Sequence, residues 1–272
     1  MVSAGLQSIA EGGLASSTII SGGAQAIASG GKAVSTTIYN GGAQSIGVGG
    51  SASYTTINGG QQILAEGTED NPGGYSEHIT INGGTLTVND YATAKIDSAT
   101  GGMLELLENG LAEAWLMGGT SFTFDDAFAR GDTVRLGTDN STIGKSLVIT
   151  NMDGYANFYI NTDLANNVAD TITMTNVTNA TEANKIYINY DPTLATGTTV
   201  ASTNTTVATV GTANTATFEG AESTIGGYSF MPTITTTDNG LTWSITGVSL
   251  VGSSEQMYTV LGNASAQAAF WR

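Results

Sequence analysis

The sequence predicts an all-β protein that folds as a single-stranded parallel β-helix, a solenoid in which stacked coils bury their apolar faces against one another. Three observations point to this fold class. Gly-Gly pairs recur at regular intervals, short segments rich in Ile, Thr and Ala separate them, and the text between the pairs is nearly constant, as in "GGAQAIASGGKAVSTTI" followed by "GGAQSIGVGGSASYTTI". The chain has 272 residues, 37 of them Gly and none Cys.

The spacing of the Gly pairs sets the size of one coil. A longer and a shorter interval alternate between successive pairs, so two intervals make a repeat of about 18 residues. A fixed period of this length is typical of solenoids. The pairs are Gly12-Gly13, Gly22-Gly23, Gly30-Gly31, Gly41-Gly42, Gly49-Gly50 and Gly59-Gly60.

The segments between the pairs suit strands and exclude helical repeats, because Gly-Gly interrupts any helical periodicity after one or two turns. In "SYTTIN" we expect Tyr54, Thr56 and Asn58 on one side and Ser53, Thr55 and Ile57 on the other. In "QSIGV", Gln44, Ile46 and Val48 share a face. Each Gly pair can supply the positive φ of a corner, which predicts two strands and two corners per coil.

The middle of the chain continues this pattern less regularly. Residues 101–124, "GGMLELLENGLAEAWLMGGTSFTF", have helical propensity, but their Gly residues again leave strand-length pieces, so we predict strands. Residues 68–77, "TEDNPGGYSE", are the best candidate for a projecting loop.

Composition limits the classes of partner. The chain carries 23 acidic and 7 basic residues, a net charge of −16. It would repel nucleic acid and anionic membrane surfaces. It has neither a long apolar span nor a basic-then-apolar leader, so Met1 is expected to begin a fragment or a mature piece.

Residues 1–67 resemble the short repeats of AIDA-type adhesin passengers, which belong to the bacterial autotransporters. The likeness lies in "TIISGGAQAIASGGKAVSTTIYNGGAQSIGVGG". The resemblance implies a surface-displayed or secreted passenger of a Gram-negative bacterium, exported through its own outer-membrane β-barrel.

Two later segments resemble the pertactin-like passenger pattern, which implies a right-handed coil. In "NMDGYANFYINTDLANNVADTITMTN", residues 151–176, Asp170 leads into the next strand. In "STIGGYSFMPTITTTDNGLTWSITG", residues 223–247, the Gly-aromatic pair is Gly227 and Tyr228, and Trp243 lies in the closing strand, with Asn239 where an acid is common.

The resemblance implies three regions. Residues 1–120 form the repeat coils, and residues 121–252 form a C-terminal autochaperone region. Residues 253–272 begin a linker toward a barrel that would follow Arg272. The aromatic core expected of the autochaperone region is Phe218, Tyr228, Phe230 and Trp243.

Two enzymatic motifs fit poorly. "DNSTIGKS", residues 139–146, approaches a phosphate-binding loop, but Asp139 replaces the required first Gly and the next residues suit a strand. Clustered carboxylates in β-helix enzymes hydrolyse glycosides, which makes Asp125, Asp126 and Asp163 candidates. The "NTD" order is reversed relative to polygalacturonases, so the other interpretation is a turn in which Asp163 caps backbone donors.

The remaining chemistry is sparse. His78 is the single histidine, no Ser lies in a nucleophile elbow, and no calcium-binding repeat occurs, so we expect no catalytic residue, no cofactor and no metal. Arg130, Gly131 and Asp132 spell the tripeptide that integrin-binding proteins present on loops. The alternative is a turn between two coils.

These observations favour a monomeric adhesin-type rod that binds a receptor or glycan on a host cell or a neighbouring bacterium without catalysing a reaction. The alternatives are a structural stalk for an upstream domain and a polysaccharide-degrading enzyme. Export with the C-terminal end first would leave that end to fold first and to template the Gly-rich coils.

Overall fold

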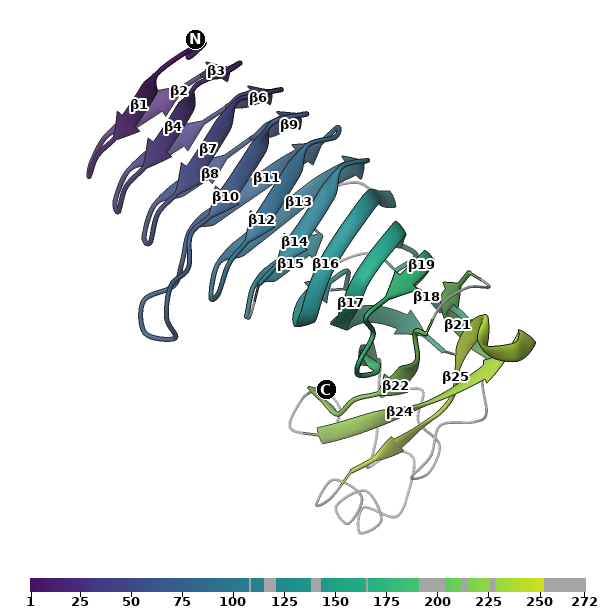
Figure 1. Cartoon of the computed structure of the whole chain (residues 1–272). Helices are drawn as coiled ribbons and strands as arrows, with labels where there is room; N and C mark the ends of the chain where they lie inside the picture. The colour runs from purple at the N-terminus through teal and green to yellow at the C-terminus, as the bar shows by residue number, and fades with distance from the viewer. Residues whose placement is uncertain are drawn as a thin grey trace.

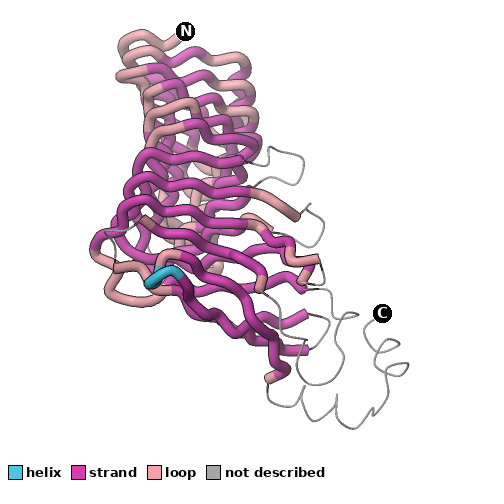
Figure 2. Tube along the Cα trace, turned by 90° about the vertical axis from the view of Figure 1, so that its right-hand side faces the viewer, coloured by secondary structure: helices cyan, strands magenta, loops and turns pink. Residues whose placement is uncertain are grey.

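The structure is a computed structural model that describes residues 1–107, 109–114, 121–137, 143–164, 166–190, 204–211, 215–225 and 228–251. Its strands stack in successive coils along one axis, from the N-terminal end toward the C-terminal part of the chain (Figure 1). The same stack is seen in Figure 2, where short strands alternate with turns in the first coils and longer strands dominate the later ones. The predicted all-β, coil-stacking architecture is confirmed for these residues.

The elements fall into three groups along the chain. The short strands of the first coils are β1 Leu6–Ile9, β2 Leu14–Ser16, β3 Ile19–Ile20, β4 Ala24–Ile27, β5 Lys32–Val34, β6 Thr37–Tyr39, β7 Ala43–Ile46, β8 Ser51–Ser53, β9 Thr56–Asn58 and β10 Gln61–Leu64. The middle strands are β11 Tyr75–Ile81, β12 Thr85–Val88, β13 Thr93–Thr100, β14 Met103–Leu106, β15 Leu111–Ala114, β16 Ser121–Arg135 and β17 Ser146–Asp163. The last are β18 Val168–Ala169, β19 Thr171–Thr178, β20 Asn184–Tyr190, β21 Thr205–Val210, β22 Phe218–Gly220, β23 Ser223–Ile225, β24 Tyr228–Thr237, a 3₁₀ turn at Asp238–Gly240, and β25 Thr242–Leu250.

Each of the first coils contains three strands, not the two predicted from the Gly pairs. β1, β4, β7 and β10 pair in parallel to form the first stack. β2, β5 and β8 form the second stack, and β3, β6 and β9 form the third. The prediction missed one corner per coil because that corner contains no Gly.

Non-glycine residues in the left-handed region make this third corner. Ser17, Ser35, Tyr54 and His78 have φ between 53° and 59°. Thr18, Thr36 and Thr55 follow the first three of them and are buried. Tyr54 therefore lies at a corner, Ser53 closes the preceding strand, and Thr56 and Asn58 face outward, while Thr55 and Ile57 face the core as predicted.

The two members of a Gly pair have different tasks. Gly41 has a φ of +75°, so it supplies the turn itself. Gly42 has an ordinary φ, but a Cβ there would lie 2.6 Å from the carbonyl oxygen of Ile20 in the preceding coil. One Gly is needed for its backbone conformation, and the next for the close approach of two coils.

The core is a set of vertical ladders. Ile27 and Ile46 are paired in one stack, and Ile20, Ile38 and Ile57 in another. All five are buried, with at most 2% of their surface exposed. Each apolar side chain therefore packs on its equivalents in the neighbouring coils, as expected of a solenoid.

A polar ladder also runs inside the first coils. Gln25 donates to Gln7 at 2.7 Å, Gln44 donates to Gln25 at 2.7 Å, and Gln62 donates to Gln44 at 2.6 Å. The Nε2 of Gln62 also donates to the Ser76 hydroxyl at 3.0 Å. Gln44 shares the buried face of Ile46, as predicted, whereas Val48, predicted on the same face, lies in the turn after β7; the amide of Gln44 is satisfied by the coils on either side.

The coils lengthen toward the C-terminus. In the first coils the register runs Leu6, Ala24, Ala43 and Gln61, which confirms the predicted repeat. Farther along it runs Met103, Asp126, Asn151 and Asn176, so each coil takes up more of the chain. β16 and β17 run continuously around these wider coils, whose interior holds aromatic side chains such as Phe124 and Phe158.

The pairing changes at the C-terminal end of the described chain. β19 still pairs in parallel with β21, and β20 with β22. β24 then pairs antiparallel with β23 and β25, and β25 pairs antiparallel with β21. The antiparallel strands lie across the end of the parallel stack (Figure 1).

The predicted local features have mixed outcomes. Strands β14, β15 and β16 confirm the expectation for the described part of residues 101–124. A loop projects between β10 and β11, although its last predicted residues, from Tyr75, already belong to β11 (Figure 1). The linker at 253–272 lies outside the described residues. The division of the chain at residue 120 and the right-handed coil remain predictions.

Among described residues, no helix has the length and apolar character needed to cross a membrane.

Candidate functional site

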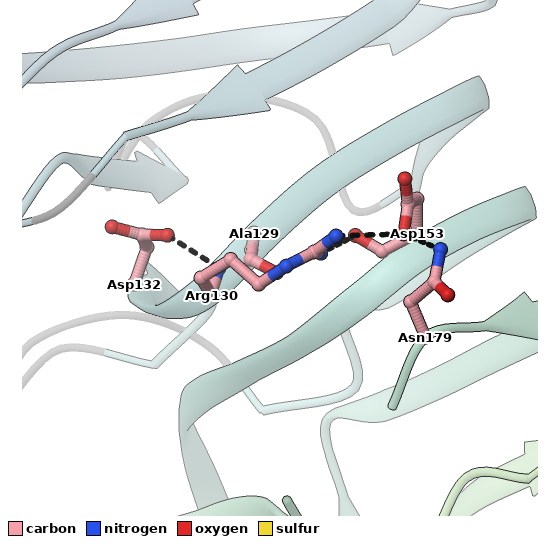
Figure 3. Close-up of polar contacts among 5 residues, drawn as sticks. All are labelled: Ala129, Arg130, Asp132, Asp153 and Asn179. Carbon is pink, nitrogen blue, oxygen red and sulfur yellow. Dashed lines mark hydrogen bonds and ion pairs between the residues drawn. The ribbon is translucent and has the colours of Figure 1, made fainter. Parts of the chain in front are cut away.

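Arg130, Gly131 and Asp132 lie within β16 at a β-bulge. Arg130 pairs with Tyr155 and Asp132 pairs with Ala156, so Gly131 is the extra residue. Its φ of +92° is one that glycine adopts without strain. The tripeptide therefore makes a bend in β16, which pairs with β17 at Arg130 and Asp132 and with β15 from Thr133 onward (Figure 3).

Arg130 binds the next coil. Its Nη1 donates to the carbonyl oxygen of Asp153 at 2.7 Å, and its Nη2 donates to the carboxylate of Asp153 at 3.0 Å (Figure 3). Asn179, one coil farther on, donates to the same carboxylate at 2.8 Å. The bond from Asn179 and the charge of Arg130 lower the pKa of Asp153. The guanidinium also lies 4.4 Å from the ring centre of Phe128.

Asp132 is buried, with 1% of its surface exposed. One carboxylate oxygen accepts the backbone N–H of Arg130 at 2.7 Å, and the other has no hydrogen-bond partner in the described chain. Burial raises the pKa of Asp132. A receptor that reads this tripeptide must reach its carboxylate, so the geometry favours the structural interpretation over an integrin-type site.

The three candidate carboxylates all accept hydrogen bonds from other parts of the chain. Asp125 accepts the backbone N–H of Gly102 at 2.9 Å, and Asp126 accepts the side-chain amide of Asn151 at 3.0 Å. Asp163 accepts both the backbone and the side-chain N–H of Asn166, at 3.2 and 2.7 Å. The predicted capping turn at Asp163 is confirmed. Asp126 pairs with Asn151 near the start of β17, whereas Asp163 ends that strand, so the carboxylates occupy different parts of the coil.

The segment whose sequence is close to a phosphate-binding loop donates backbone hydrogen bonds to a buried carboxylate of the same chain. Residues 138–142 lie outside the described chain, but the backbone N–H groups of Gly144 and Lys145 both donate to Asp170, at 2.9 and 2.8 Å. Asp170 also accepts the N–H of Asn161 at 2.8 Å. Its side chain is fully buried, and burial raises its pKa. Asp170 thus ties three segments together, which explains its place before β19.

The corner row of the middle coils carries an aromatic pair. The rings of Tyr54 and His78 stack with centroids 4.4 Å apart and planes within 1°. His78 Nδ1 lies 3.2 Å from a carboxylate oxygen of Asp97 in the next coil. Tyr54 is 57% exposed. No group of three His, Cys, Asp or Glu side chains suited to a metal ion occurs in the described part of the chain.

The predicted autochaperone core is partly described. Phe218 and Phe230 are buried, and Trp243 packs against the core beside Phe218. The side chain of Tyr228 lies outside the described residues, and so does Gly227. Whether these residues act in folding remains a prediction.

The outward side chains differ among the three stacks. The first stack carries acids, and the second carries both signs of charge. The acids of the first stack are Glu105, Asp126 and Asp153, and the charged residues of the second are Lys32, Glu77, Lys95, Glu113, Arg135 and Lys185.

The third stack presents two rows of uncharged, mainly polar side chains, which we call the hydroxyl face; Ile19 precedes the first row, and Val148 is an apolar member of the second. Its first row is Thr37, Thr56, Thr80, Ser98, Ser121, Ser146 and Thr171. Its second row, on the next outward position of each strand, is Tyr39, Asn58, Asn82, Thr100, Thr123, Val148 and Thr173. The sequence shows "TIN" twice, but only the register reveals the rows.

Comparison with known proteins adds little. No protein-family model and no curated protein matches the sequence. Among solved structures, a match is the crystal structure of a TibC-catalyzed hyper-glycosylated TibA55-350 fragment, with 19% identity and a TM-score of 0.34. The alignment covers 68% of this chain and 75% of that one. At this level the likeness carries no argument about function.

Proposed function

We propose that the chain is a surface-displayed or secreted autotransporter passenger of adhesin type. It acts by holding a stiff β-helical rod away from the outer membrane of a Gram-negative bacterium and binding a receptor or glycan on another cell. In this proposal the rod is monomeric and is exported through the outer-membrane barrel of its own full-length chain.

The observation that carries the proposal is the uninterrupted parallel stack. From Leu6 to Asn176, every coil is bonded to the next, and its interior is filled by apolar ladders and the Gln ladder. Such an object resists bending because each coil is fixed by both neighbours. The AIDA-type text of residues 1–67 and the pertactin-like text of residues 151–176 and 223–247 support the same assignment.

We further propose that the rod binds without catalysis. Support comes from Asp125 and Asp126, which are bonded to neighbouring coils, from Asp163, which is bonded within its own turn, and from Asp132, which is buried. Retaining and inverting glycosidases need two carboxyl groups about 5 to 10 Å apart across a substrate. Incubation with pectins, other polysaccharides and peptide libraries should release no product. Turnover that disappears on Asp126→Asn or Asp163→Asn would contradict this part.

Cell binding tests the adhesin assignment. The fluorescently labelled chain should bind cultured epithelial cells or Gram-negative bacteria saturably, and unlabelled chain should compete. The same chain, heat-unfolded, is the matched control for nonspecific adsorption. Absence of saturable binding to every cell type would favour the stalk alternative, in which an upstream domain carries the activity.

A further inference from the structure

We propose that the hydroxyl face binds an extended, neutral glycan chain, with Tyr39 and Tyr54 as the rings on which sugar units stack. This inference deepens the proposed function and rests on it. It specifies both the surface and the chemistry of the partner.

The first step is charge. The chain has a net charge of −16, yet none of the side chains in the two rows of the hydroxyl face is charged. The nearest acids lie at its edges, where Asp97 contacts His78 and Asp125 binds Gly102. An anionic polymer would be repelled by the molecule as a whole, and a cationic partner would prefer the acids of the first stack. A neutral partner fits best.

The second step is hydrogen-bonding capacity. Hydroxyl and amide groups both donate and accept, as sugar hydroxyls do. Asn82 donates to Asn58 at 3.0 Å, and Thr100 lies 3.3 Å from the Asn82 oxygen, so the second row is already ordered. The rows repeat about every 4.8 Å along the rod and lie about 7 Å apart. A polymer lying along the rod would meet hydroxyl or amide groups at nearly every coil.

The third step is the pair of exposed aromatic rings at the two edges of the face. Tyr39 heads the second row, beside the glycine corner, and is 44% exposed, and Tyr54 is 57% exposed at the opposite corner, before the first row. The stack on His78 holds the Tyr54 ring in place. Exposed rings offer an apolar face and a polar hydroxyl, which suits the apolar faces and hydroxyl edges of sugar rings.

The fourth step is shape. An open hollow of about 250 Å³ lies at the glycine corner that follows Tyr39 and Asn58, lined by Gly41, Gly42, Ala43, Gly59, Gly60, Gln61 and Thr85. Because the glycines carry no side chains, nothing projects from the corner to fill the hollow, although most backbone N–H groups there are already bonded within the turn or to neighbouring coils. The hollow continues the second row around the edge of the face, so a glycan chain could turn into it.

The test uses the whole chain and three soluble neutral polysaccharides, mixed-linkage β-glucan, galactomannan and dextran, with polygalacturonate as the anionic polymer. Affinity electrophoresis and titration calorimetry should detect at least one neutral polymer, and added salt should leave its binding unchanged. Tyr39→Asn introduces the residue type found at the equivalent position of the next coil, and Tyr54→Ser introduces the residue type found at the equivalent corner of the preceding coils. Both variants should therefore fold. Each should weaken binding roughly tenfold.

A charge placed on the face provides the matched comparison. Thr80→Asp, on the hydroxyl face, should abolish binding, whereas Thr93→Asp, on the second stack, should leave it unchanged; circular dichroism confirms that both fold. Equal loss in the two variants, or salt-sensitive binding to polygalacturonate alone, overturns the inference. So does a concentration-dependent dimer that Thr80→Asp dissociates, because a second copy would then be the occupant. Cell binding that survives in all face variants overturns the inference but leaves the adhesin assignment intact.

Discussion

The indole of Trp243 lies against the ring of Phe218, with centroids 5.5 Å apart and planes inclined by 52°. Its Nε1 donates to the carbonyl oxygen of Gly240 at 3.1 Å, which closes the turn between β24 and β25. The contact joins an antiparallel strand to β22, the strand that pairs in parallel with β20. It therefore links the end of the coil stack to the strands that cover it.

Removal of this contact should loosen the C-terminal end. Trp243→Ala deletes a half-buried indole and its hydrogen bond, which should cost about 2 to 4 kcal/mol and lower the melting temperature markedly. Thermal unfolding followed by circular dichroism measures the effect. Met231→Ala, at an exposed position of β24, is the control and should change little. Equal melting temperatures for the two variants would contradict the role of Trp243.

The two glycines of one pair should respond differently to substitution. Gly42→Ala places a Cβ 2.6 Å from the Ile20 carbonyl oxygen, so the coils must separate. Gly41→Asn meets no such contact, and Asn tolerates a positive φ. We expect Gly42→Ala to destabilise the protein by several kcal/mol and Gly41→Asn by about 1 kcal/mol or less. Urea unfolding would refute this difference if both variants lost the same stability.

The interior Gln ladder should be sensitive to loss of one rung. Gln44→Leu removes the donor to Gln25 and the acceptor of Gln62, and leaves buried amide groups with fewer partners. The expected cost is about 2 to 4 kcal/mol in the free energy of unfolding. Gln61→Leu, at an exposed position of β10, is the matched control, and chemical unfolding of both variants should separate them. A neutral Gln44→Leu would mean that the ladder adds no stability over an apolar core.

Asp132 should make stability depend on pH. Its pKa is raised in the folded chain, so the folded state binds more protons, and its contribution to stability falls as pH rises through that raised pKa. Asp132→Asn keeps the acceptor for the Arg130 N–H and removes the buried charge. The variant should be more stable than the parent at pH 7, and the difference should shrink as pH falls toward the ordinary Asp pKa of about 4. Urea midpoints across this range test the sign; a constant difference would contradict it.

The repeating features of the fold can be predicted from the sequence, whereas features that depend on contacts between neighbouring coils cannot. The Gly pairs from Gly12 to Gly60 reveal the coil length because the first Gly of each pair supplies the positive φ of a corner. The third corner cannot be recognised from the sequence, because Ser35 and Tyr54 form it and residues of these types rarely adopt a positive φ. Burial of Asp132 and the rows of the hydroxyl face follow from register between coils, and no local pattern encodes that register.

The two ends of the rod should differ in their ability to fold alone. In residues 1–67 the aromatic side chains are Tyr39 and Tyr54, and both are exposed, so they add nothing to the core. Residues 121–252 instead bury Phe122, Phe124, Phe158, Phe218 and Phe230. Each buried aromatic removes about 150 to 250 Å² from water, at about 25 cal/mol per Å².

We therefore expect a fragment of residues 121–252 to fold without the rest and residues 1–120 to remain unfolded, because thin coils gain stability mainly from a neighbour already in place. Circular dichroism should show a cooperative melt for the C-terminal fragment alone, and limited proteolysis should leave it intact. Mixing the fragments tests templating: residues 1–120 should gain protease resistance only when residues 121–252 are present. A cooperatively melting N-terminal fragment beside an unfolded C-terminal one would reverse the assignment, since the Gly-rich coils would then be the end that folds first.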